Sequence, residues 1–323
     1  MFVKKKARCR NTRYGLKLLP VISIRDHAIG FRFSTTGLCL LMLVAVYRPE
    51  PTQAHADLML LIEDLNREIA KAPNNPENYL RRGQLFREHS DYELAYADIE
   101  RAAALSPPPA NIDLYRGRLF LDWGWPLTSR ACLDRFLTRQ PRNADGLVLR
   151  ARALAKLNQR LAATQDYDRA IALSPEAGPD MFVERAQMLV AEGPEYIAEA
   201  VKGLDDGIQK LGPLVTLQLF AIDAELKRGN FDGALARVDK VAERSPRKET
   251  WLSRRAEILV QAGRPDEAKR SYEAALAALQ TLPPTRRNVP AMQELARHIR
   301  SEIDSLGGKN SAAPGGSVVP PKP

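Results

Sequence analysis

Few side chains in this 323-residue sequence are suited to act as nucleophiles, acid–base groups or metal ligands. Beyond residue 56 the only histidines are His89 and His298, which stand near opposite ends of that segment, and the only cysteine is Cys132. The run Asp205-Asp206-Gly207 lacks the other ligands of a calcium loop, and no Walker loop, GxGxxG, HExxH, GxSxG or CxxC motif occurs. Because catalytic and metal sites need several convergent groups, we expect no catalytic residue, no metal site and no cofactor.

One triplet, His89-Ser90-Asp91, brings a histidine, a serine and an aspartate together. Serine and aspartate are also preferred helix N-caps, and the triplet falls at an expected turn between helices, so we interpret it as capping. The single Cys132 excludes an internal disulfide beyond residue 56, and we expect it to be a small buried apolar side chain.

The positive charge of the chain, +9 overall, is concentrated at its start. Residues 1–56 hold ten Lys or Arg against two acids. Within this segment a basic start is followed by the apolar run Gly37–Tyr47 and then by Ala54-His55-Ala56. This order is typical of a signal peptide, which predicts cleavage after Ala56 and export to the periplasm or beyond. An uncleaved anchor or a wrongly assigned start codon is the alternative.

Eleven apolar residues rise about 16 Å as a helix, roughly half of a bilayer's hydrocarbon core, so we expect no stable membrane span after cleavage. The rest of the chain is nearly neutral, which argues against a nucleic-acid partner.

A period of 34 residues organises the segment that follows. Small, aromatic and apolar residues recur at fixed places, and each of the first units ends in proline. The first unit holds Tyr79, Gly83, Phe86, Ala95, Ile99, Ala102 and Pro107, and the next holds Gly117, Phe120, Ser129, Leu133 and Pro141. The fourth unit fits only with about two residues inserted near Pro194-Glu195-Tyr196, and the first helix of the fifth unit departs from the pattern at Ile222 and Glu225.

This pattern resembles the tetratricopeptide repeat, in which two antiparallel helices cross closely at small residues such as Gly83 and Ala95. The resemblance implies an all-α, right-handed superhelix of about six repeats over residues 76–280. We expect a capping helix at 57–75 and another at 290–306, so that the solenoid spans 57–306, followed by a disordered tail at 307–323.

In this family the first helix of each repeat lines a concave surface, where a partner peptide or protein would bind. By register, the resemblance assigns partner contact to Leu80, Gln84, Leu114, Tyr115, Arg118, Val148, Arg152, Val183 and Gln187. The apolar members suit a helix or an extended peptide, but ordinary packing between repeats is the favoured explanation for them. Arg118 and Arg152 would meet a carboxylate, although the Lys and Asn pattern of the family's clamp for acidic C-terminal peptides is missing.

Two further features recur or stand out. An arginine precedes the small residue of the first helix in most repeats. This regularity favours a structural role, in which the guanidinium stays in water or pairs with a carboxylate on the next repeat. The turn Trp123-Gly124-Trp125-Pro126 is either a contact patch or packing.

The sequence therefore predicts a non-enzymatic adaptor of the cell envelope that holds a protein or peptide in its groove. The alternative is a structural accessory subunit of an exported enzyme or an envelope-assembly complex. Partner identity and oligomeric state stay open.

Overall fold

The computed structural model describes residues 53–310, and side-chain burial is defined for residues 58–307. Within these residues every regular element is helical, as the sequence predicts. The helices are α2 (Gln53–Lys71), α3 (Pro76–Glu88), α4 (Tyr92–Ala104), α5 (Ile112–Asp122), α6 (Pro126–Arg139), α7 (Ala144–Lys156), α8 (Arg160–Leu173), α9 (Pro179–Glu192), η1 (Pro194–Tyr196), α10 (Ile197–Leu211), α11 (Val215–Lys227), α12 (Phe231–Arg244), α13 (Lys248–Gln261), α14 (Pro265–Thr281), α15 (Pro284–Arg287) and α16 (Pro290–Asn310).

The predicted signal peptide and tail lie mostly outside the described residues. Helix α2 begins at Gln53, ahead of the expected cleavage site, and α16 runs to Asn310. The four residues 307–310, expected in the tail, are therefore helical. None of the described helices is both long enough and apolar enough to cross a bilayer.

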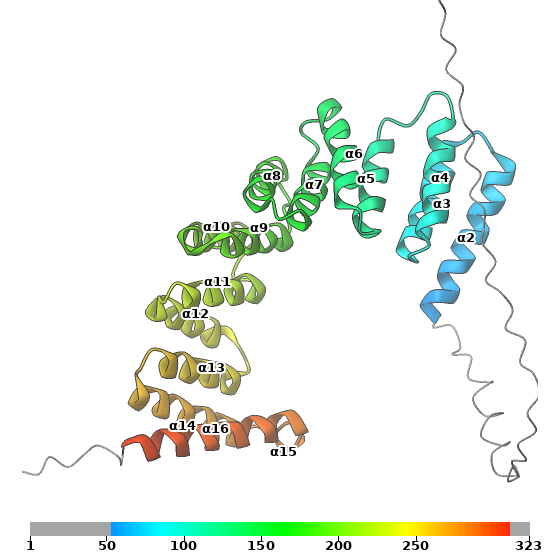
Figure 1. The fold of residues 1–323 in the computed structure, drawn as a ribbon. Coiled ribbons are helices and arrows are strands. Elements are labelled where there is room, and N and C mark those ends of the chain that lie inside the picture. The colour runs from blue at the N-terminus through cyan, green and yellow to red at the C-terminus, as the bar shows by residue number, and fades with distance from the viewer. Residues whose placement is uncertain (1–52, 311–323) are drawn as a thin grey trace, which may run out of the picture. The chain divides into compact units, whose positions relative to one another are not determined.

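Helices α3 to α14 form six consecutive pairs, which confirms the predicted repeats (Figure 1). Within each pair the two helices pack together, and the second helix of one pair packs on the first helix of the next. First helices also contact each other, α3 with α5, α5 with α7 and α9 with α11, so they share one face. This arrangement sets the side chains of α3, α5, α7 and α9 beside one another.

Small residues at the helix crossings make the close pairing possible. A Cβ atom on Gly83 would stand 3.2 Å from the carbonyl oxygen of Ala95, which confirms the expected crossing. In the next repeat a Cβ atom on Gly117 would meet Leu133 Cγ at 2.6 Å. Ser129 uses the same proximity to donate a 2.7 Å hydrogen bond from its hydroxyl to the Gly117 carbonyl.

The recurring arginines form what we call the arginine ladder, which is structural as predicted. Each guanidinium reaches the second helix of its own repeat, the second helix of the preceding repeat, or both. The expectation of a partner on the next repeat is corrected. The contacts are Arg82 with Asp98 and Asn66, Arg116 with Glu100, Arg150 with Asp166 and Asp134, Arg185 with Asp168 and Glu199, and Arg255 with Asp239 and Ser271.

The two irregular repeats are accommodated locally. The extra residues of the fourth repeat form η1, after which Ala200 and Leu204 are fully buried, as expected. In the fifth repeat Ile222 is also fully buried. Glu225 is only 3% exposed there, and it accepts hydrogen bonds from Arg228 and Asn230, which satisfy its carboxylate.

The end helices cover the terminal repeats. Glu68 of α2 pairs with Arg81 of α3 at 3.3 Å. At the other end α16 packs on α14, and Ile299 and Leu306 are buried in the core of the last two repeats. These contacts fit the capping roles that the sequence indicates.

Candidate partner-binding groove

The first helices of the first four repeats surround a cavity of about 720 Å³, which we call the central groove. Residues three or four apart on a helix share a face, and this spacing brings Val148, Arg152 and Ala155 of α7 into the lining. The full lining is Arg87, Arg118, Leu121, Asp122, Asp145, Val148, Leu149, Arg152, Ala155, Lys156, Tyr167, Met181, Glu184, Gln187 and Met188. The groove thus mixes apolar and charged side chains from α3, α5, α7, α8 and α9.

Four of the nine residues assigned to partner contact line this groove: Arg118, Val148, Arg152 and Gln187. Gln187 and Arg152 are exposed, whereas Val148 is 7% exposed and offers little side-chain surface.

The other five assigned residues lie outside the groove lining. Leu80 is fully buried and Val183 is 8% exposed, so both serve the core between helices. Leu114 and Tyr115 are half-buried and pack against core clusters. Gln84 donates a 3.1 Å hydrogen bond to Glu88 on its own helix. Packing between repeats therefore accounts for most of the apolar positions in this set.

Arg152 is held inside the groove by a bidentate ion pair. Its Nε and Nη2 atoms lie 2.9 and 2.8 Å from the two carboxylate oxygens of Glu184, and the Tyr167 hydroxyl donates to the same carboxylate. Burial alone would raise the pKa of Glu184, but the hydrogen bonds from Arg152 and Tyr167 hold it below its usual range. Burial and the bond to Glu184 raise the pKa of Tyr167. This trio is therefore internally satisfied.

Arg118 differs from Arg152, because it has no hydrogen bond or ion pair with any described residue. Lys156 and Asp145, also in the lining, have none either, whereas Arg87 pairs with Asp122. The groove therefore presents two unpaired cations and one unpaired carboxylate beside Met181, Met188 and Ala155. Such a surface suits a segment that combines an acidic group with apolar side chains.

Several lining residues escaped the sequence analysis. Glu184 occupies the same register position as Tyr115, so the pattern that picked Tyr115 would also have picked it. Tyr167 has the 1% exposure of a core residue, although its hydroxyl bonds to Glu184 in the groove. The methionines Met181 and Met188 lie beside assigned positions and carry no motif.

Among the described residues, the side chains that could act in catalysis or metal binding do not gather at one place. Burial raises the pKa of the Cys132 thiol, which opposes formation of the nucleophilic thiolate. Asp91 stands at the N-cap of α4 but makes no side-chain cap bond, and its carboxylate lies 2.7 Å from His89 Nδ1 instead. The predicted side-chain cap is therefore wrong for Asp91. Across residues 53–310 no three His, Cys, Asp or Glu side chains gather as metal ligands.

The turn between α5 and α6 builds an aromatic cluster. Trp123 and Trp125 stack with ring centroids 4.6 Å apart, and Phe120 and Tyr92 stack on them. Trp125 remains 50% exposed beside Leu127, which is 69% exposed. The turn thus combines packing with an exposed patch.

One family model and several solved structures are similar to this chain. A family model described as tetratricopeptide repeat matches residues 225–299. No curated protein matches the chain. The C-terminal part of a TPR repeat-containing protein from Cytophaga hutchinsonii is 17% identical, with a TM-score of 0.56 over 70% of this chain and 92% of that one.

Two further solved structures are similar at lower scores. A tetratricopeptide repeat protein from Parabacteroides merdae is 18% identical, with a TM-score of 0.46 over 76% of this chain and 93% of that one. The Pseudomonas aeruginosa protein pilF is 16% identical, with a TM-score of 0.47 over 69% of this chain and 97% of that one.

Proposed function

We propose that the chain is a non-enzymatic scaffold of the tetratricopeptide-repeat type, whose central groove holds a short acidic and apolar segment of a partner protein. The family model over residues 225–299 and the paired-helix fold support this. Interaction with other proteins is the general use of this family's fold. The finer proposal concerns the groove, the ligand of the groove and the location of the protein in the cell.

The observation that carries the proposal is the unpaired Arg118 in a groove of about 720 Å³. A cation without a carboxylate partner is available to one from a ligand, and the neighbouring methionines adapt readily to apolar side chains. Arg152 supports this wall indirectly, because its ion pair with Glu184 joins α7 to α9.

The location of the scaffold forms part of the proposal. The basic start, the apolar run Gly37–Tyr47 and Ala54-His55-Ala56 support export, so we place the mature protein in the periplasm or outside the cell. Its partner would then be an envelope or secreted protein.

The test is a cross-linked pull-down from the native host with tagged full-length protein, read by mass spectrometry. Arg118→Glu should lower recovery of the partner at least about tenfold, because it replaces an attractive charge by a repulsive one. The matched control is Arg286→Glu, which makes the same charge change at an exposed arginine of α15 outside the groove. Equal recovery with both variants would show that the groove does not hold the partner.

A second candidate, a structural accessory subunit of an exported enzyme or envelope-assembly complex, is favoured by the exposed Trp125 and Leu127 beside the aromatic stack. Exposed aromatic clusters are frequent anchors of stable interfaces. A stoichiometric complex on gel filtration that Trp125→Ser disrupts and Arg118→Glu leaves intact would favour this candidate over the groove.

A further inference from the structure

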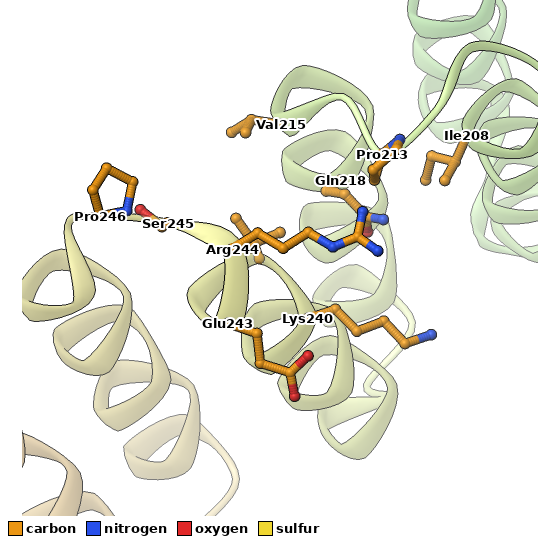
Figure 2. Close-up of a pocket in the computed structure, with 10 residues that line it drawn as sticks. Ile208, Pro213, Val215, Gln218, Lys240, Glu243, Arg244, Ser245 and Pro246 are labelled. Atoms are coloured by element: carbon orange, nitrogen blue, oxygen red, sulfur yellow. The ribbon is translucent and has the colours of Figure 1, made fainter.

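A second cleft of about 580 Å³ lies where α10 ends, α11 begins and α12 ends, and we call it the edge cleft. It shares no lining residue with the central groove. Its apolar wall is made by Ile208, Val215 and Val241, and its polar groups include Gln218 and Arg244. Figure 2 labels Ile208, Val215, Gln218 and Arg244 around the connection between α10 and α11 and the end of α12.

The carboxamide of Gln218 has no partner in this cleft. The residue is only 6% exposed, its Oε1 atom is buried, and its side-chain amide makes no hydrogen bond with any described residue. Buried amides are nearly always hydrogen-bonded, because leaving one without a partner costs its lost hydration. An unsatisfied amide in the wall of a cleft therefore points to a ligand with a hydrogen-bond donor.

Arg244 supplies an unpaired positive charge at the same place. It forms no ion pair or hydrogen bond with any described residue, and in Figure 2 its side chain extends from the end of α12 toward Gln218 and Pro213. Lys240, one turn earlier, is unpaired as well but points away from the centre of the view. The α12 side of the cleft thus carries two cations, Lys240 and Arg244, against one carboxylate, Glu243, and of these Arg244 extends toward Gln218.

The start of α11 adds unpaired backbone donors. Its N-cap residue, Leu214, provides no side-chain cap, the first turn contains no acid, and the first helical bond runs from the Gln218 N–H to the Leu214 carbonyl. The N–H groups of the first turn are therefore open to an acceptor, and the helix dipole favours a negative one. Val215 and Gln218 place this turn in the cleft wall.

From this combination we propose that the edge cleft is a second peptide-binding site, specific for a short apolar segment that carries a carboxylate. The carboxylate pairs with Arg244 and the first turn of α11, and apolar side chains cover Ile208 and Val241. The Gln218 amide turns about its side-chain torsions, so that its oxygen, buried in the free protein, accepts a backbone N–H of the peptide. A phosphate ion would engage the cation but would leave the apolar wall uncovered. The site is independent of the proposed function of the central groove.

The test uses a random hexapeptide library displayed on phage and selected on the full-length protein. Sequences that also bind the Gln218→Leu variant are discarded, and the remaining peptides are synthesised and titrated by fluorescence anisotropy. We expect them to contain an acidic residue among apolar ones. Arg244→Glu should weaken their binding at least about tenfold, because the ion pair is lost and the new carboxylate repels that of the peptide.

Two controls separate the edge cleft from other sites. Arg270→Glu, at an exposed arginine of α14, and Arg118→Glu, in the central groove, should leave the affinity unchanged. Inorganic phosphate should compete weakly, since it lacks apolar groups. If no peptide depends on Gln218, if Arg244→Glu binds as well as wild type, or if phosphate displaces the peptides at equal concentration, the proposal is wrong.

The stability of the Gln218→Leu variant is a second readout of the proposal. Replacing Gln218 by leucine removes a buried unpartnered amide at similar volume, so the urea midpoint should rise while peptide binding falls. A falling midpoint would mean that the amide supports the fold instead, and it would overturn the proposal.

Discussion

Arg118 and Arg152 occupy the same register position in consecutive repeats, yet their surroundings give them different roles. Arg152 is fixed by Glu184, whose carboxylate also accepts from Tyr167, whereas Arg118 has no described partner. Charge reversal at Arg152 would break this pair and place two carboxylates together, so its effect on binding would be mixed with an effect on folding. Arg118 is the cleaner probe of the groove.

Gly117 shows how tightly single residues are constrained at the helix crossings. An added methyl group would stand 2.6 Å from Leu133 Cγ, and Leu133 is fully buried and has no room to retreat. We expect Gly117→Ala to lower the free energy of unfolding by about 1–3 kcal/mol, measured by urea unfolding followed by circular dichroism. The control is Gly307→Ala in α16, where nothing lies within 4 Å and alanine should gain up to about 1 kcal/mol. Equal effects would contradict this account.

Between elements, the arginine ladder fastens most first helices to the second helix of the same repeat, of the preceding repeat, or of both. Arg150 is the clearest case: it contacts Asp166 in its own repeat at 2.7 Å and Asp134 in the preceding repeat at 2.9 Å. A single guanidinium thus spans three helices. Removing it would loosen an interface between repeats as well as a pair within one.

The burial of the carboxylate decides how much each ladder arginine contributes. Asp166 is 5% exposed at its side chain, while Glu100, the partner of Arg116, is 36% exposed. Arg150→Met should therefore cost about 3 kcal/mol, because the buried Asp166 loses its bidentate partner and keeps only Arg169 at 3.7 Å. Arg116→Met should cost about 1 kcal/mol or less, because Glu100 is in water and the buried Asp113 keeps Arg135 and Arg139. Urea midpoints of both variants at pH 7 check this ranking. Similar losses would show that burial does not control the ladder.

Over the whole molecule, the 34-residue period was enough to predict the fold, because small residues and prolines mark most of the helix pairs directly. The groove was only partly predictable. Register placed Arg118, Arg152 and Gln187 in it, but it does not say which side chains are buried, so Leu80 and Val183 were assigned to a surface they do not reach. The edge cleft has no motif, since it is formed where three helix ends meet.

Stability of the whole solenoid should depend on its buried carboxylates at low pH. Burial would raise the pKa of Asp113, but hydrogen bonds from Arg139 and Arg135 hold it below its usual range, and Glu184 is lowered in the same way. A carboxyl group whose pKa is lower in the folded than in the unfolded state stabilises the fold at a pH above its unfolded pKa of about 4. This contribution is lost as the pH falls through the pKa of the folded state. We therefore expect the urea midpoint to fall as the pH is lowered from about 5 to about 3. Asp113→Asn should be less stable than wild type at pH 7 and should show a smaller further fall at pH 3, since it has no carboxylate left to protonate; an equal fall would remove Asp113 from this explanation.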